Sequence, residues 1–158
     1  MKTTFKLTLA AFLAAGVLSS SAFAQNSPVV MRIIAGSTGL FVPTSHSLTT
    51  SGYTDFAANI KVREDGSATG QFVCAAPGAV VIAGQAVSAV TNSDGSVTIN
   101  GVGYGYFIGV GGFENDSFFV TFRAGGPRVG GFDFADATFP AGFYDTEVVK
   151  LGSVTIDQ

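Results

Sequence analysis

The chain has few of the residues that usually carry chemistry, since its 158 residues include one Cys, one His and no Trp. A single Cys excludes a disulfide framework and an iron–sulfur cluster, and with one His it also excludes a zinc site built from these residue types. Charged residues make up only 12% of the chain, and its net charge is −3. No basic patch is present to neutralise phosphates, so no nucleic acid is expected as a partner.

The first 24 residues have the three parts of a secretory signal. Two lysines precede an apolar run at residues 7–18, and Ala22-Phe23-Ala24 places small residues at the positions that a signal peptidase reads. The run is shorter than the roughly 20 apolar residues that span a bilayer. We therefore expect cleavage before Gln25, a single β domain over residues 25–158, and export to the periplasm or medium of a bacterial cell. Membrane insertion after signal removal is not expected.

Helix signals are scarce beyond the signal, and apolar residues there alternate with the period of two that is typical of strands. Residues 55–62 and 68–75 each place their apolar side chains on one face. A three-residue loop Glu64-Asp65-Gly66 would pair Val62 with Ala68 and bring both apolar faces to the same side. A two-residue loop would shift the register by one residue and oppose apolar with polar side chains. The sequence therefore predicts the three-residue turn.

The same reasoning applies to a second hairpin. A loop of Ser93-Asp94-Gly95 pairs Ala89 with Ile99 and Thr91 with Val97, and leaves the more polar positions on the opposite face. The alternation also predicts strands at residues 104–110, 118–122 and 147–156, with a bend or a bulge at Gly70 and a break near Gly152. Longer loops are expected at residues 36–52, 111–116 and 125–143. These elements predict an all-β antiparallel meander of about eight or nine strands that closes into a small barrel or sandwich.

Two stretches carry a resemblance to a known group of proteins. The first is Asp65-Gly66-Ser67-Ala68-Thr69-Gly70-Gln71-Phe72, and the second runs from Thr98-Ile99-Asn100-Gly101 through Tyr106-Phe107-Ile108 to Asn115-Asp116-Ser117-Phe118. Together they resemble a group of small uncharacterised exported bacterial all-β domains. Gly111-Gly112 stands where that group has an acidic turn. The resemblance implies an exported all-β module and no known chemistry.

Candidate catalytic and metal-binding residues are few. His46 is the only histidine that could act as a base, and it lies in a polar Ser/Thr-rich segment, where an exposed loop histidine is expected. Asp145 and Glu147 would point the same way on an extended strand, and we expect a solvent-facing row there rather than a pair of glycosidase carboxylates. Two groups of acidic and amide residues could supply oxygen ligands to calcium, and a role as turn residues is favoured for both. The two groups are Glu114, Asn115 and Asp116, and Asp133, Asp136, Asp145 and Glu147.

The aromatic residues are expected to fill the core, because aromatic side chains at strand spacing usually do so. Tyr104 and Tyr106 are the strongest candidates for an exception, since Gly103 and Gly105 beside them would let a flat ligand or a second backbone approach. Packing in the core is favoured for both tyrosines. Cys74 is expected to be buried on an uncharged face, reduced and slow to react.

No catalytic, cofactor-binding or metal-binding residue is assigned by the sequence. The favoured function is that of an exported, non-catalytic structural or interaction module with no cofactor and with a protein or small-ligand partner. The alternatives are a small barrel that binds an apolar ligand, an eight-stranded outer-membrane barrel and a secreted hydrolase. The last of these has no supporting motif.

Overall fold

The computed structural model describes residues 27–42, 52–76, 80–107, 111–136 and 143–158, apart from the side chains of residues 41, 42, 80, 107, 113–116, 136 and 143–145. These residues form eight β-strands. The strands are β1 (Val29–Val42), β2 (Tyr53–Arg63), β3 (Ala68–Ala76), β4 (Val80–Thr91), β5 (Val97–Phe107), β6 (Gly111–Arg123), β7 (Gly131–Asp136) and β8 (Phe143–Asp157). Within the described ranges, no helix is long and apolar enough to cross a membrane.

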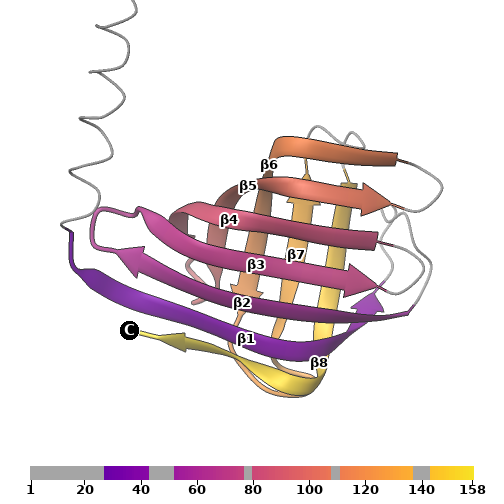
Figure 1. The fold of residues 1–158 in the computed structure, drawn as a ribbon. Helices are drawn as coiled ribbons and strands as arrows, with labels where there is room; N and C mark the ends of the chain where they lie inside the picture. The colour runs from indigo at the N-terminus through magenta and orange to yellow at the C-terminus, as the bar shows by residue number, and fades with distance from the viewer. Residues whose placement is uncertain (1–26, 43–51, 77–79, 108–110, 137–142) are drawn as a thin grey trace, which may run out of the picture.

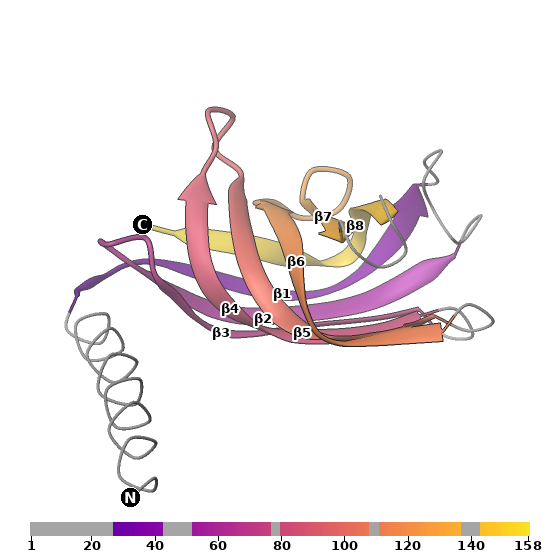
Figure 2. The same ribbon diagram turned by 90° about the horizontal axis from the view of Figure 1, so that it is seen from above.

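The eight strands form one closed antiparallel barrel. Each strand pairs with the next along the chain, and β8 closes the barrel by pairing with β1. Figure 1 shows β2–β5 stacked across the front, with β7 and part of β8 running steeply behind them. In Figure 2, turned by 90°, β7 and β8 lie on one side of the β2–β5 layer. The prediction of an all-β antiparallel meander that closes into a barrel is confirmed.

The β2–β3 hairpin has the predicted three-residue turn. Val62 pairs with Ala68, and the amide of Gly66 donates a 2.9 Å hydrogen bond to the carbonyl of Arg63. Gly66 has a φ of +80°, the left-handed conformation that glycine adopts at least cost. Hydrogen bonds from Ser67 hold the pKa of the Asp65 carboxyl below its ordinary value.

The β4–β5 hairpin repeats this Asp-Gly-Ser turn. Ala89 pairs with Ile99 and Thr91 with Val97, as predicted. One oxygen of Asp94 accepts hydrogen bonds from the hydroxyl of Ser96 at 2.6 Å and from its amide at 3.0 Å. These bonds hold the pKa of the Asp94 carboxyl below its ordinary value. Both hairpins therefore use the same local device to fix their register.

Three stretches that were expected to be loops contain strands, and these predictions were wrong. Residues 36–42 continue β1, residues 111–116 begin β6, and residues 131–136 form β7. Their Gly, Ser and acidic residues have low intrinsic strand preference. Pairing with neighbouring strands overrides this preference. Residues 36–40 are paired with both β2 and β8, and residues 131–136 with both β6 and β8, whereas residues 111–116 are paired with β5 alone.

The break expected near Gly152 is confirmed as a β-bulge. Thr38 pairs with Leu151 and Gly39 with Val149, so Lys150 is an extra residue on β8. Gly152 itself has a φ of +86°. β8 turns a corner in Figure 1, so that its first part runs beside β7 and its later part runs beside β1. β8 also begins earlier than expected, at Phe143 instead of Glu147.

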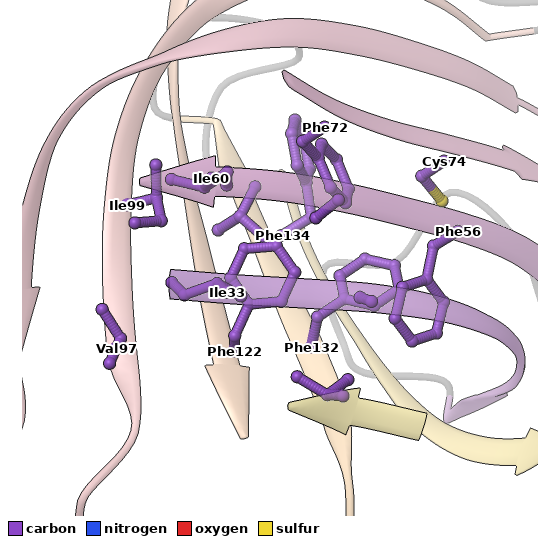
Figure 3. Packing of buried hydrophobic residues seen from close by; sticks show 14 of the residues in the cluster. Ile33, Phe56, Ile60, Phe72, Cys74, Val97, Ile99, Phe122, Phe132 and Phe134 are labelled. Carbon is purple, nitrogen blue, oxygen red and sulfur yellow. The ribbon is translucent and has the colours of Figure 1, made fainter. Parts of the chain in front are cut away.

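The barrel interior is filled by apolar side chains, with phenylalanines at its centre (Figure 3). The rings of Phe56 and Phe132 lie 4.3 Å apart edge to face, and those of Phe72 and Phe132 lie 5.5 Å apart. Such edge-to-face contacts stabilise a core beyond the burial of area alone. The expectation that the aromatic residues fill the core is confirmed for Phe56, Phe72, Phe118, Phe122, Phe132 and Phe134.

Candidate functional site

Most of the acidic residues considered as calcium ligands fall outside the side chains that the structure describes. These are Glu114, Asn115, Asp116, Asp136 and Asp145, and His46 also lies outside the described residues. Of the second acidic group, Asp133 and Glu147 are described, and they do not come together. Asp133 pairs with Thr146 and Phe132 with Glu147, so the two carboxylates lie on opposite faces of the sheet. Among described residues, no group of three His, Cys, Asp or Glu gathers as a metal site.

Glu147 points into the barrel, which corrects the expectation of a solvent-facing acidic row. Its side chain is only 2% exposed. The hydroxyl of Thr54 donates a hydrogen bond to Oε2, and Sγ of Cys74 lies 3.8 Å from Oε1. Glu147 is two residues from the buried Val149, and adjacent odd-numbered positions of a strand share one face.

Cys74 is buried, as predicted, with 3% of its surface exposed. It pairs with Phe56 on the neighbouring strand, in the predicted register. The hairpin face around it carries no charged residue, as expected, and the carboxylate of Glu147 reaches it from β8, outside the hairpin. The hairpin sequence carried no information on this contact, since the two residues are 73 positions apart.

Asp133 is held on the outer side of β7 by an ion pair with Arg123 of β6. Its second oxygen, Oδ1, is buried and has no hydrogen-bond partner among the described residues. Thr121 pairs directly with Asp133 across the strands. The ion pair therefore cross-links two neighbouring strands of the barrel wall.

Tyr104 and Tyr106 point away from the barrel, so the expectation that they pack in the core was wrong. They are 55% and 58% exposed. Side chains of β5 alternate between the two faces of the barrel wall without interruption. Odd-numbered residues such as Val97 and Ile99 point inward, and even-numbered residues point outward. The alternation from Val97 onward is the sequence signal that would have placed both tyrosines on the outer face.

Tyr104 borders a hollow on the outer face of β2–β5, which is the face turned toward the viewer in Figure 1. The hollow has a volume of about 870 Å³, and no charged side chain is among the described residues that line it. The residues that line it from the outer face are Ala57, Asn59, Gln71, Val73, Ala83, Gln85, Val87, Val102 and Tyr104. A second hollow of about 480 Å³ adjoins it at Ala57 and Val73 and reaches Asp55 and Leu151.

Two rows of side chains run across the strands and shape the larger hollow. One row is small and apolar and ends at the tyrosine, with Ala57, Val73, Ala83 and Tyr104 paired in turn across β2–β5. The other row consists of amides and ends at a valine, with Asn59, Gln71, Gln85 and Val102 paired in turn. Because paired residues on neighbouring strands lie side by side, each row is a continuous line on the surface.

The three amides of the second row are exposed and available for binding. Asn59, Gln71 and Gln85 all lie on the solvent side of their strands. Within the part of the chain that the structure describes, none of these amides has a hydrogen bond to another protein group. Each amide provides a carbonyl acceptor and an NH₂ donor. The outer hollow thus offers hydrogen-bonding groups of both kinds next to an aromatic ring.

No protein-family model, curated protein or solved structure matches the chain.

Proposed function

We propose that the protein is an exported, non-catalytic binding module that recognises its partner through the outer hollow of β2–β5. The observation that carries this proposal is the uncharged hollow of about 870 Å³, bordered by the 55% exposed Tyr104. Ligand sites are typically concave, largely apolar and furnished with a few placed polar groups. The hollow has this composition, with Val73 and Val102 beside the amide row.

The interior of the barrel gives less support to the alternative of an internal apolar ligand. The centre is occupied by packed aromatic rings, including Phe118 and Phe122, which are at most 1% exposed. A ligand there would have to displace side chains that already fill the space, and displacing a well-packed core is costly. The outer face requires no such displacement.

The polarity of β2 also favours a water-facing module over an outer-membrane barrel. Membrane barrels place apolar side chains outside and polar side chains inside. Here the buried positions of β2 are mostly apolar, while Asp55, Asn59 and Lys61 occupy its exposed positions. The two faces of β2 therefore have the opposite polarity to those of a membrane-barrel strand.

Export rests on the sequence, and the absence of catalysis rests on the sequence together with the burial of Glu147. The lysines, apolar run and Ala22-Phe23-Ala24 of residues 1–24 favour a cleaved signal. The resemblance to exported bacterial all-β domains favours the same compartment. The carboxylate of Glu147 is buried in the packed barrel interior, on Thr54 and Cys74, which favours a structural role for it over acid–base chemistry.

The proposal is tested by retention on the envelope of the producing cell. The full chain is expressed with Tyr104→Ala and Gln71→Ala combined, and separately with Tyr53→Ala, which alters an equally exposed tyrosine outside the hollow (55%). We expect the wild type and Tyr53→Ala to stay with the washed envelope and the double variant to be released. Equal partition of all three proteins would contradict recognition through the hollow.

A further inference from the structure

The amide row, the exposed Tyr104 and the uncharged lining of the hollow together indicate the chemical class of its ligand. We propose that the hollow binds an uncharged oligosaccharide that lies across β2–β5. One of its sugar rings lies against Tyr104, and hydroxyls of its consecutive units are bonded to Asn59, Gln71 and Gln85. This inference rests on the proposed binding function and names its ligand class.

The amide row matches the hydrogen-bonding needs of a sugar. A hydroxyl both donates and accepts, and so does the side-chain amide of Asn or Gln. Asn59 pairs with Gln71, and Gln71 with Gln85, so the three amides stand on three successive strands. Successive strands lie about 4.8 Å apart, which is close to the length of one pyranose unit. The row can therefore bond to consecutive units of one chain.

Tyr104 supplies the apolar contact that a sugar ring also needs. A pyranose has C–H groups on its faces, and an aromatic ring presents a flat apolar surface with a polar tip. Tyr104 belongs to the row of Ala83, Val73 and Ala57. The side chains of these three residues are small and project little from the sheet, so they leave space beside the tyrosine ring. A ring lying against Tyr104 thus stays within reach of the amide row, since the two rows are adjacent on every strand.

The lining of the hollow carries no charged side chain among the described residues, which favours an uncharged ligand. The described residues that line the hollow include no Asp, Glu, Lys or Arg. An anionic glycan or a phosphorylated group buried here would lose hydration without gaining an opposite charge. A protein partner would be expected to meet Trp, Arg or further Tyr at the centre of its interface, whereas the centre of this hollow consists of amides, valines and alanines.

The experiment uses protein expressed from the full chain and titrated with hexasaccharides of defined structure. The uncharged probes are cellohexaose, chitohexaose and maltohexaose, and hexagalacturonate is the charged control. Binding is followed by calorimetry and by the side-chain amide NMR signals of Asn59, Gln71 and Gln85. We expect at least one uncharged probe to bind and to shift these signals, with no comparable effect of hexagalacturonate.

Three variants distinguish this site from a non-specific surface. Tyr104→Ala should weaken binding of the responding probe about 10-fold or more, and Gln71→Ala about 3- to 10-fold. Tyr53→Ala removes an equally exposed tyrosine outside the hollow and should leave the affinity unchanged. All three positions are exposed, so thermal unfolding should show that the variants stay folded.

The outcomes separate the ligand class from the binding function. If no uncharged probe binds, or if Tyr53→Ala weakens binding as much as Tyr104→Ala, the oligosaccharide proposal is wrong. If the oligosaccharide proposal fails while Tyr104 and Gln71 still govern retention on the envelope, the hollow binds a protein or a lipid surface and the proposed function stands. Loss of both effects would overturn both proposals.

Discussion

Gly39 leaves open the space that the carboxylate of Glu147 occupies. A Cβ atom at Gly39 would lie 2.5 Å from Oε2 of Glu147 and 3.4 Å from the ring of Phe56. The glycine on β1 and the buried acid on β8 are therefore complementary, although the two lie far apart in sequence. The same carboxylate accepts a hydrogen bond from Thr54 and contacts Cys74, so a single substitution at Gly39 disturbs the whole buried polar cluster.

Gly39→Ala should destabilise the protein by about 1–3 kcal/mol, because the added methyl group overfills a packed interior. The carboxylate would have to move away from Thr54, which leaves polar atoms without their bonds. The free energy of unfolding, measured in urea, tests this. Gly36→Ala on the same strand is the matched control, since a Cβ there meets nothing within 4 Å. The control should change stability by less than about 0.5 kcal/mol, and an equal effect of the two substitutions would contradict the argument.

The two Asp-Gly-Ser turns predict a loss of stability in acid. Hydrogen bonds from Ser67 and Ser96 lower the pKa values of Asp65 and Asp94 in the folded state. The unfolded chain then binds protons more readily than the folded protein, so the free energy of unfolding rises with pH between the lowered folded pKa values and the ordinary pKa of aspartate. The contribution is complete above about pH 4, the ordinary range of an aspartate, and is lost as the pH falls through the lowered folded values.

The double substitution Asp65→Asn with Asp94→Asn removes this titration, while Asn still favours a turn. Urea midpoints of the wild type and the double variant, measured from pH 2 to pH 6, provide the test. We expect the wild-type advantage to be largest at pH 6 and to shrink toward pH 2. A difference that stays constant over this range would show that the turn carboxylates do not carry the effect.

Cys74 should react with thiol reagents only when the protein unfolds. Its surface is 3% exposed, and a reagent must reach the sulfur to form a bond. Labelling in native buffer should be slow and should become rapid in denaturant. Cys74→Ala should cost on the order of 1 kcal/mol or more through lost packing. Rapid native labelling, or a dimer that disappears on reduction, would contradict the β2–β3 register.

The hairpins could be predicted from sequence because their evidence is local. Asp-Gly turns place two alternating strands next to each other, and only one loop length brings both apolar faces together. The pairs Val62 with Ala68 and Ala89 with Ile99 follow from this parity alone, and both are present. Closure of the barrel was predicted as one of two outcomes, because a sandwich has the same alternation.

The missed features depend on contacts between distant segments. The extra residue Lys150 changes the parity of β8, so Val149 and Val154 both point inward although they are five positions apart. A break near Gly152 was expected, but that Lys150 is the extra residue depends on the pairing of β8 with β1. Gln71 was placed correctly on the polar face, but its alignment with Gln85 requires the β3–β4 register. The outer hollow could not be inferred without that register.

The ring of Phe118 occupies the space left by two glycines on neighbouring strands. Cβ atoms at Gly84 and at Gly101 would both overlap this ring. Gly84→Ala should therefore destabilise the protein by about 2 kcal/mol through overpacking, and Phe118→Leu, which shortens the side chain, should relieve the collision. In a double-mutant cycle the two substitutions should couple favourably by about 1 kcal/mol or more.

Gly101→Ala provides the comparison for this cycle, because its Cβ would also lie 2.8 Å from the backbone carbonyl oxygen of Gln85, whereas a Cβ at Gly84 would lie 3.0 Å from the carbonyl oxygen of Val102. Shortening Phe118 cannot move that backbone atom, so the rescue of Gly101→Ala should be weaker than that of Gly84→Ala. Urea unfolding of the single and double variants measures both coupling energies. Equal rescue at the two glycines, or no rescue at Gly84, would show that the ring of Phe118 is not what keeps these positions free of side chains.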